Sequence, residues 1–331
     1  MSGPAAMVLG AGFGTRLQPL THTLAKPACP VLGRPLIEFT LSQLAPLNPR
    51  TVVVNLHHLP DTLRACLDPA PFGLPIQTLF EPEILGTGGG LKNARDRLAD
   101  ADVVLLLNGD TICDADLAAL LAAHRKSDAL ATLLLLDDPR TAKYGAVEVD
   151  DGSAIVDFAE LRGQRGVRRG LFVGAHALSP RLFDFLPNDD VFCIVRHAYV
   201  PLLESRPGAV RAHFAGARFF DLGTPYDYLL GQWALLDDPG GFTFALNGVR
   251  ESSAQVWSEK PPRVTRPPVW IAPDALVDDE AVLGPYVIVG HGAHVGPAAR
   301  LHHCIVWPGA SVDRELDQAI ITPAGEHAVG Y

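Results

Sequence analysis

Short apolar runs alternate with longer amphipathic segments over the first two thirds of the chain. The apolar runs, which are aliphatic or β-branched and predict strands, lie at residues 6–9, 51–55, 102–107 and 129–136. The segments with helical character lie at residues 35–44, 61–67, 89–98 and 114–125. Continuous aliphatic strands that alternate with helices are typical of a parallel sheet buried on both faces. We therefore expect an α/β fold of the Rossmann type, with helices on both faces of the sheet.

A hairpin is predicted in the middle of the chain. Residues 145–149 and 154–158 are two short segments joined across an Asp-Asp-Gly turn. Such a turn favours antiparallel pairing, so the sheet is expected to be mixed and mostly parallel. The sequence Asp-Asp-Pro-Gly-Gly at residues 237–241 is a cluster of turn residues and predicts the end of this α/β region.

The aliphatic pattern changes in the last quarter of the chain. Aliphatic residues recur there at intervals of six, and after one slip of register the last two follow: Ile271, Val277, Leu283, Val289, Val295, Leu301, Val306 and Val312. A six-residue aliphatic repeat predicts a left-handed parallel β-helix, in which each hexad forms one side of a triangular coil. A chance meander of loops and strands is the alternative.

These patterns predict three parts of the chain. Residues 1–240 form the α/β domain, residues 241–267 a proline-containing linker, and residues 268–331 a short β-helix of the hexapeptide-repeat type. At about three hexads per coil, this β-helix has only about two to three coils, so it requires docking or capping to be stable. We expect it to dock on the α/β domain or to form a homo-oligomer.

Composition narrows the function classes. The 331 residues carry a formal net charge of -10, which argues against a nucleic-acid binder. The five cysteines form no C-x-x-C pair, which favours a reducing cytoplasm over a disulfide framework or a zinc site. The N-terminus lacks the pattern of a secretory signal, and no run reaches the ~20 apolar residues of a membrane helix. We therefore expect a cytoplasmic protein that binds neither nucleic acid nor membrane.

A glycine-rich loop follows the first predicted strand. Residues 9–17 read Leu-Gly-Ala-Gly-Phe-Gly-Thr-Arg-Leu, and glycines of this kind let backbone N–H groups approach a phosphate. The N-terminus of a following helix would also favour an anion. Thr15 stands where a dinucleotide fingerprint has its third glycine, and the Gly-Lys-Ser/Thr of a Walker loop is absent. The remaining interpretation is a phosphate-binding loop in which the forked guanidinium of Arg16 suits a triphosphate. A structural turn without a ligand is the alternative.

This loop belongs to a longer motif. Residues 10–21 read Gly-x-Gly-x-Gly-Thr-Arg-Leu-x-Pro-Leu-Thr, and Lys26, Pro27, Pro30 and Pro35 follow. Further motifs (Gly-Thr-Gly-Gly-Gly, Asn-Gly-Asp, Tyr-Gly and Asp-Leu-Gly-Thr-Pro) lie at residues 86–90, 108–110, 144–145 and 221–225. Over about residues 5–236, the chain resembles the sugar-1-phosphate nucleotidyltransferases, or nucleotide-sugar pyrophosphorylases. A β-helix is often appended in this family.

The resemblance implies a reaction and a set of charged residues. A sugar phosphate oxygen attacks the α-phosphorus of a nucleoside triphosphate and pyrophosphate leaves, so catalysis is mainly charge neutralisation and in-line positioning. Arg16 would hold the β- and γ-phosphates, and Lys26 would lie near the reacting phosphates. Asp110 and Asp221 would hold Mg²⁺. Taken singly, Asp110 could be a strand-end turn residue, Asp221 a helix cap and Lys26 a solvated lysine.

The resemblance also assigns binding residues. The nucleotide-binding set is Leu9, Gly10, Ala11, Gly12, Gly14, Thr15, Glu81, Gly86, Thr87 and Gly90. The sugar-phosphate-binding set is Asn108, Gly109, Gly145, Glu160 and Gly174. Glu81 would lie near the base, and residues 86–90 would line the nucleoside, with a flexible loop as the alternative for that glycine segment.

Two departures from the family pattern bear on substrate choice. Many members have Glu-Lys-Pro where this chain has Glu-Leu-Arg at residues 160–162, so Arg162 either replaces a missing lysine or is a solvated arginine. The segment at 172–176 lacks an asparagine that many family members have there, and its His176 fits a strand position. In this respect the chain resembles the mannose- or heptose-1-phosphate guanylyltransferases. We expect GTP with such a sugar, and the alternative is a uridylyltransferase for an N-acetylmuramate-type 1-phosphate.

Two other function classes are weaker. A non-catalytic relative that binds a nucleotide sugar is free to lose the four charged residues that this chain retains. An acyltransferase would use a β-helix histidine, but such enzymes usually need more coils than this tail provides. The histidines of the tail, which we expect on turns and at the surface, are His291, His294, His302 and His303.

Overall fold

A computed structural model describes residues 3–238, 256–257, 262 and 264–330 of the chain. The chain folds into two compact units. The first unit is Met1–Phe13 with Ile37–Phe219, and the second is Gly14–Leu36 with Phe220–Tyr331. Within the described residues, every helix is too short or too polar to span a membrane.

The first unit is built on a mixed sheet with the strand order β10-β9-β11-β6-β1-β4-β5, in which β8 pairs with β11 and β12 with β8. Its strands are β1 (Ala5–Leu9), β4 (Val52–Leu56), β5 (Ile76–Phe80), β6 (Val104–Asn108), β8 (Ala131–Leu136), β9 (Val147–Val149), β10 (Ile155–Phe158), β11 (Arg168–Leu178) and β12 (Val210–Ala215). Strands β6, β1, β4 and β5 are parallel, whereas β11 is antiparallel to β6, β8 and β9.

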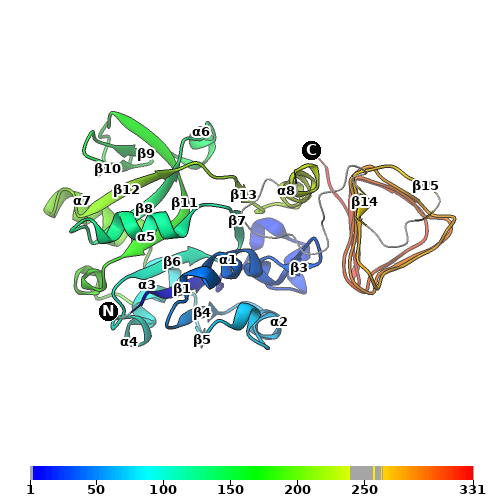
Figure 1. The fold of residues 1–331 in the computed structure, drawn as a ribbon, viewed down its shortest axis with the longest axis horizontal. Helices are drawn as coiled ribbons and strands as arrows, with labels where there is room; N and C mark the ends of the chain where they lie inside the picture. The colour runs from blue at the N-terminus through cyan, green and yellow to red at the C-terminus, as the bar shows by residue number, and fades with distance from the viewer. Residues whose placement is uncertain (1–2, 239–255, 258–261, 263, 331) are drawn as a thin grey trace. The chain divides into compact units, whose positions relative to one another are not determined.

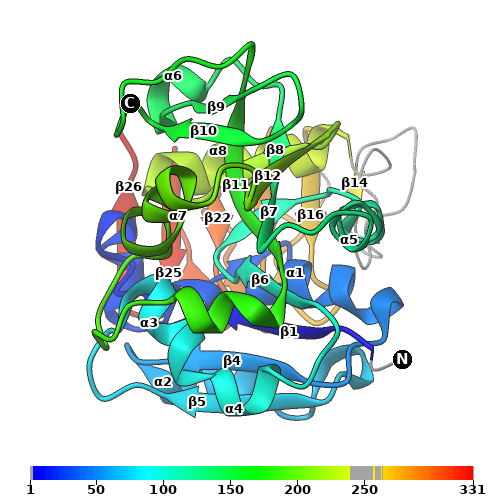
Figure 2. The ribbon, with the colours of Figure 1, turned by 90° about the vertical axis from the view of Figure 1, so that its left-hand side faces the viewer.

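Helices cover this sheet. They are α1 (Ile37–Leu44), α2 (Pro60–Cys66), α3 (Gly86–Asn93), α4 (Arg95–Leu98), α5 (Leu117–Arg125), α6 (Thr141–Tyr144) and α7 (Val200–Ser205). Figures 1 and 2 show α3 and α1 on opposite sides of β1 and β6. Shorter turns of helix are η4 (Ala45–Leu47), η5 (Pro71–Gly73), η6 (Pro180–Phe185) and the π-helical η7 (Val195–Tyr199). The α/β fold expected from the alternating pattern is confirmed.

The interior of the sheet is aliphatic. Met7 lies opposite Val53 on β4 and Leu106 on β6, and all three side chains are fully buried. Leu133 of β8 is buried in the same cluster. Burial of such side chains removes apolar surface from water and is the main stabilising contribution to folding. The continuous aliphatic runs of the sequence are therefore strands covered on both faces.

Three local predictions can be compared with the elements. The hairpin is confirmed, because β9 and β10 pair antiparallel. The helix predicted at 89–98 begins earlier, at Gly86, and consists of α3 and α4. The helix predicted at 114–125 begins at Leu117, because a short strand, β7 (Thr111–Cys113), precedes it and the Asp116 carboxylate accepts the N–H of Ala119 at 2.9 Å as an N-cap.

The C-terminal part of the second unit consists of short strands in parallel stacks. One stack is β14 (Val256–Trp257), β16 (Val269–Ile271), β19 (Val287–Val289), β22 (Ile305–Val306) and β25 (Ala319–Thr322). The other two are β15 (Val264–Thr265), β18 (Val282–Leu283), β21 (Arg300–His302) and β24 (Glu315–Asp317), and β17 (Leu276–Val277), β20 (His294–Val295) and β23 (Ser311–Val312). Figure 1 shows these strands as stacked triangular coils.

The strand register explains the six-residue pattern. Val269 lies opposite Val287, which is 18 residues (287 − 269) or three hexads later. Ile288 lies opposite Ile305, 17 residues later, at the point where the sequence slips by one. Leu283 and Leu301 are fully buried and stack on each other inside the coil. This is the arrangement expected for a parallel β-helix, and β26 (Gly325–Ala328) ends it by pairing antiparallel to β25.

Residues 14–36 pack with this β-helix and with α8 (Pro225–Asp237) inside the second unit. Their elements are η1 (Thr15–Leu17), η2 (Leu20–His22), η3 (Lys26–Ala28), β2 (Pro30–Val31) and β3 (Arg34–Pro35). The N–H of Leu32 donates to Gln232 of α8 at 3.0 Å. A Cβ on Gly33 would lie 2.5 Å from the Trp270 ring of β16, so the absence of a side chain permits this packing. Most of the expected linker at 241–267 lies outside the described residues.

Candidate active site

Three charged residues predicted to handle phosphates come together in the second unit. Asp221 ends the strand β13 (Phe219–Asp221). Its Oδ1 lies 3.5 Å from Nζ of Lys26, and its Oδ2 lies 3.4 Å from Nη1 of Arg16. Lys26 is only 4% exposed, so it is not a solvated loop lysine. Arg16 and Lys26 place two cationic side chains beside this carboxylate, and positive charge of this kind suits a polyanionic ligand.

Glycines create the room for this cluster. Gly14 has a φ of 63°, and a Cβ there would lie 3.1 Å from Cβ of Lys26 and 2.9 Å from Cγ2 of Thr21. A Cβ on Gly223 would lie 2.9 Å from Nη1 of Arg16, so the guanidinium passes directly over this residue. Gly14 therefore suits both its left-handed backbone and the close packing of Thr21 and Lys26, whereas Gly223 leaves room for the Arg16 guanidinium.

The element after the glycine loop differs from the expected helix. It is η1, a single three-residue 3₁₀ turn that contains Thr15 and Arg16. The side chain of Arg16 remains 64% exposed, and its fork faces Asp221 at 3.4–3.5 Å. These contacts are longer than the ~2.7–2.9 Å of a tight charge-assisted bond, so the guanidinium is held loosely enough to receive a phosphate.

Asp221 is not the N-cap of α8. Thr224 fills that position, because its Oγ1 accepts the N–H of Asp227 at 3.0 Å. The cap that the sequence left as an alternative for Asp221 is therefore excluded. Its carboxylate is instead directed to Arg16 and Lys26.

In the first unit, Leu9 ends β1 and the start of the glycine loop follows it. The N–H of Gly10 donates to Oδ1 of Asn55 at 2.8 Å, so the protein itself uses this donor. Ala11 is buried, whereas Gly12 is exposed and a Cβ there would meet nothing within 4 Å. Within this part of the loop, Gly12 is the position most open to a ligand.

Glu81 follows β5 and is fully buried. Its Oε1 accepts Nδ2 of Asn55 at 2.8 Å, and its Oε2 accepts the N–H of Leu85 at 3.3 Å. Nδ1 of His57 lies 2.8 Å from the Glu81 carbonyl oxygen. Sequence reasoning missed Asn55, which lies in β4, and His57, which directly follows that strand.

The glycine segment at 86–90 is the beginning of helix α3, which excludes a flexible loop. The N–H groups of Gly88 and Gly89 donate to the carbonyl of Phe192 at 3.0 and 3.3 Å. A Cβ on Gly88 would lie 2.2 Å from the Phe192 ring. Oγ1 of Thr87 accepts the N–H of Ile194 at 3.1 Å. These glycines accommodate the segment around Phe192, which no local sequence signal had indicated.

Three of the sugar-phosphate candidates lie together. Asn108 ends β6, and the N–H of Gly109 donates to the carbonyl of Leu9 at 3.0 Å. Gly174 in β11 has a φ of 79°, and a Cβ there would lie 2.2 Å from Nδ2 of Asn108. Asp110 follows in the turn between β6 and β7. No group of three or more His, Cys, Asp or Glu gathers as a metal site within the described ranges.

The other two candidates lie near the β9–β10 hairpin. Gly145 has a φ of 86° and its Cβ position is 2.6 Å from Cβ of Ala159. Glu160 is exposed and forms an ion pair with Arg165 at 3.0 Å. Nη1 of Arg162 donates to the carbonyl of Val156 at 2.9 Å, so the arginine supports its own loop and is not solvated.

Three histidines outside this set pair with neighbouring side chains. His176 is buried in β11, where its Nδ1 lies 2.7 Å from the Tyr199 hydroxyl. Burial lowers the pKa of His176 to about 3, so the ring is neutral near pH 7. In the β-helix, His291 lies 2.7 Å from Asp274 and His303 lies 2.9 Å from Asp317, at positions that water can reach.

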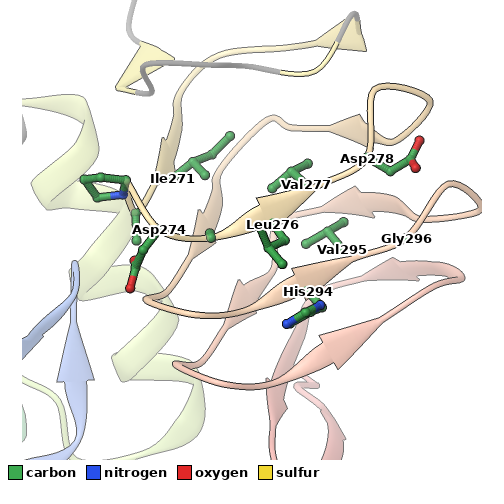
Figure 3. A pocket seen from close by; sticks show the side chains of 11 residues that line it. Ile271, Asp274, Leu276, Val277, Asp278, His294, Val295 and Gly296 are labelled. Atoms are coloured by element: carbon green, nitrogen blue, oxygen red, sulfur yellow. The ribbon is translucent and has the colours of Figure 1, made fainter.

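The β-helix has a groove of 570 Å³ on the face formed by β17 and β20. Figure 3 shows Leu276 and His294 on this face, with Asp274 and Asp278 toward its ends. None of the predicted site residues lines it. The groove is therefore separate from the candidate active site.

Known proteins resemble this chain in sequence and in fold. The family model described as nucleotidyl transferase matches residues 5–231. Mannose-1-phosphate guanylyltransferase of Mycobacterium tuberculosis is 30% identical over 93% of this chain and 81% of its own length. UTP–glucose-1-phosphate uridylyltransferase of Synechocystis is 28% identical over 98% and 95%. The crystal structure of HddC from Yersinia pseudotuberculosis, 22% identical, shares the fold with a TM-score of 0.57 over 71% of this chain and 100% of that chain. The chain belongs to the nucleotidyl transferase family, among its sugar-1-phosphate nucleotidyltransferases.

Proposed function

We propose that the chain joins a nucleoside triphosphate to a sugar 1-phosphate and releases pyrophosphate. A phosphate oxygen of the sugar 1-phosphate forms a bond to the α-phosphorus, and the bond from that phosphorus to the pyrophosphate oxygen breaks. Both reactants are anionic, so the reaction depends on neutralising charge and on alignment. The observation that carries this proposal is the cluster in which Arg16 and Lys26 face Asp221.

Each charged side chain has a distinct role in the proposal. The exposed guanidinium of Arg16 binds the β- and γ-phosphates and then the pyrophosphate. Lys26 is a compact point charge, and its burial strengthens its attraction to the reacting phosphates. Asp221 holds both cations in position before the substrates arrive. The buried lysine and its retained partner favour an enzyme over a non-catalytic relative.

Mg²⁺ suits the donors that this chain offers. Carboxylate oxygens are its preferred protein ligands, and we propose that Asp110 and Asp221 each supply one. The contacts of Asp221 with its two cations are 3.4 and 3.5 Å, which leaves lone pairs on both oxygens. When bound, the metal would supply positive charge to phosphate oxygens.

The remaining predicted residues keep their proposed roles. Leu9, Gly10, Ala11, Gly12, Gly14 and Thr15 would surround the phosphates, and Glu81, Gly86, Thr87 and Gly90 would support the nucleoside. Asn108, Gly109, Gly145, Glu160 and Gly174 would border the sugar phosphate. We retain residues 1–240 as the catalytic domain, 241–267 as a linker and 268–331 as a β-helix of the hexapeptide-repeat type. A cytoplasmic location fits the five free thiols.

GTP with a mannose- or heptose-type 1-phosphate is the substrate pair we favour. The segment Phe172–His176, which lacks the common asparagine, supports it, and so does the similarity to the M. tuberculosis guanylyltransferase. The similarity to the Synechocystis enzyme supports UTP as the alternative nucleotide. The alternative acceptor is an amino-sugar 1-phosphate of the N-acetylmuramate type.

A matrix of substrates tests the proposal. Four nucleoside triphosphates are each mixed with a panel of sugar 1-phosphates and Mg²⁺, and pyrophosphate release is measured. We expect one base and one sugar class to exceed the others clearly. Absence of release from every combination, together with tight binding of a nucleotide sugar, would favour the non-catalytic relative.

A further inference from the structure

Asn55 is a buried polar residue at the end of an aliphatic strand. It is the polar residue among the aliphatic positions of β4 (Val52–Leu56), lies between Leu9 of β1 and Leu79 of β5, and is 2% exposed. A polar side chain at such a position destabilises the fold unless hydrogen bonds replace its contacts with water. Both ends of the Asn55 amide are bonded. Oδ1 accepts the N–H of Gly10 at 2.8 Å, and Nδ2 donates to Oε1 of Glu81 at 2.8 Å.

Glu81 is bound entirely by neutral donors. Its carboxylate is fully buried and accepts Nδ2 of Asn55 and the N–H of Leu85. In the part of the chain that the structure describes, no cation lies within ion-pairing distance of it. A buried carboxylate of this kind depends on every hydrogen bond it receives, because each one offsets lost hydration. The bond from Asn55 is therefore needed by both partners.

Helix α3 closes over this pair. A Cβ on Gly90 would lie 3.0 Å from Oε1 of Glu81 and 3.1 Å from Nδ2 of Asn55. A glycine is needed there so that the helix can contact the two side chains directly. The pair thus joins two segments: the glycine loop at Gly10, and helix α3, which it meets at the N-cap Leu85 and at Gly90.

We propose that Asn55 is a positioning residue of the nucleotide site. This inference rests on the proposed function, and it assigns Asn55 and Glu81 the task of fixing the distance between the phosphate loop after β1 and the nucleoside segment that begins at Leu85. Asn55 accepts at one end of its amide and donates at the other, whereas Glu81 accepts at both oxygens. Gly10 donates to Asn55, Asn55 donates to Glu81, and Leu85 donates to Glu81. This arrangement of donors and acceptors is the one that satisfies all four groups.

This polarity gives a test by exchange of the two side-chain types. In Asn55→Asp, two carboxylates face each other, and in Glu81→Gln, one amide N–H group must face another donor. The double variant combines Asn55→Asp with Glu81→Gln. In it, the new carboxylate at position 55 would accept both the Gly10 N–H and the new amide at position 81, whose oxygen accepts Leu85. The double variant restores the full set of bonds with nearly unchanged volume.

The expected result is a pattern of KM values. Loss of a hydrogen bond to a buried charged group changes an equilibrium constant by about tenfold or more. If the bond holds the nucleotide site in position, each single variant should raise KM for the nucleoside triphosphate by about that factor. KM for the sugar 1-phosphate should change less than about twofold. The double variant should recover most of the lost affinity for the nucleotide. Asn48→Asp and Glu83→Gln make the same chemical changes at exposed positions and should leave both KM values unchanged.

Other outcomes overturn the inference. If the single variants lower only kcat, in proportion to a fall in melting temperature, Asn55 is merely structural. If the double variant is no better than the worse single variant, the bond between positions 55 and 81 is not what matters.

A second measurement is independent of turnover. Hydrogen exchange at the Gly10 amide should accelerate at least about tenfold in folded Asn55→Ala, since this amide loses its acceptor. Unchanged exchange would refute the positioning role even if no substrate pair were turned over. Failure of the wild-type protein with every substrate pair would instead count against the proposed function alone.

Discussion

At the scale of single residues, close approach of backbone and side chain explains several glycines. Gly174 combines a positive φ with a Cβ position 2.2 Å from the Asn108 amide. Gly163 also has a positive φ, 65°, but a Cβ there would meet nothing within 4 Å. The two positions separate the effect of backbone strain from that of a steric clash.

Substitution of these glycines by alanine gives a first prediction. Gly163→Ala should lower the free energy of unfolding by about 1 kcal/mol, from the left-handed conformation alone. Gly174→Ala should lower it further and also raise KM for the sugar 1-phosphate, because Asn108 must move. Urea denaturation and steady-state kinetics measure the two effects. Equal free energies of unfolding for the two variants would contradict this prediction, because the Asn108 side chain would then move aside without cost.

A second prediction concerns His176. Its pKa is lowered by burial to about 3, against about 6.5 in the unfolded chain, so the unfolded state binds the extra proton between these values. Stability should therefore fall as pH drops from about 6.5 toward 3, by up to about 1.4 kcal/mol per pH unit from this group. In His176→Gln, urea denaturation between about pH 4.5 and 7 should show a smaller slope. An unchanged slope in His176→Gln would contradict the assignment.

At the scale of elements, β1, β4, β6 and β8 were predictable because each is a largely aliphatic run, whereas β5 and β12 include polar residues and were not predicted. The start of α3 at Gly86 was not predictable. Glycines disfavour a helix locally, and what stabilises this one is Phe192, which lies far along the chain. The bonds of Asn55 to Gly10 and Glu81 likewise join segments distant in sequence. Lys26 and Asp221 could be paired from the sequence only through the resemblance to a family.

The packing of Phe192 on α3 gives a third prediction. Phe192 is 4% exposed, and a Cβ on Gly88 would lie 2.2 Å from its ring. Phe192→Ala should lower the free energy of unfolding by about 3 kcal/mol, in the range of buried phenylalanine truncations. It should also raise KM for the nucleoside triphosphate, because α3 loses its cover. Phe80→Ala, at a half-exposed position, serves as the control and should change stability much less. Equal effects on the two would contradict this account.

At the scale of the whole molecule, charge is distributed to suit small polyanions. The chain carries a net charge of -10, yet Arg16 and Lys26 place two cationic side chains beside Asp221. Local concentration of positive charge lets a negative protein bind phosphates without attracting nucleic acid. The overall charge argues against a nucleic-acid ligand. The cluster at Asp221 indicates where the anionic substrates would bind.

The β-helix gives a fourth prediction, about assembly. Leu276 is 59% exposed and lines the groove of 570 Å³. Figure 3 shows its side chain on the face formed by β17 and β20. The sequence predicts a homo-oligomer through the β-helix, and this face would be its contact with a second copy. Leu276→Asp should then reduce the molar mass measured by light scattering to that of one chain. Val167→Asp, at an apolar position that is 77% exposed, should leave the mass unchanged. A wild-type protein that is already monomeric would refute this surface.

The central claim is that Lys26 and its partners transfer a nucleotidyl group to a sugar 1-phosphate. The most direct measurement quantifies nucleotide sugar and pyrophosphate together, for the wild-type protein, for Lys26→Ala and for the exposed control Lys126→Ala. We predict one pyrophosphate per nucleotide sugar, with kcat/KM about 10²–10³-fold lower in Lys26→Ala, as for loss of one charge-stabilising group, and unchanged in Lys126→Ala. Pyrophosphate without nucleotide sugar, or full activity in Lys26→Ala, would contradict the account.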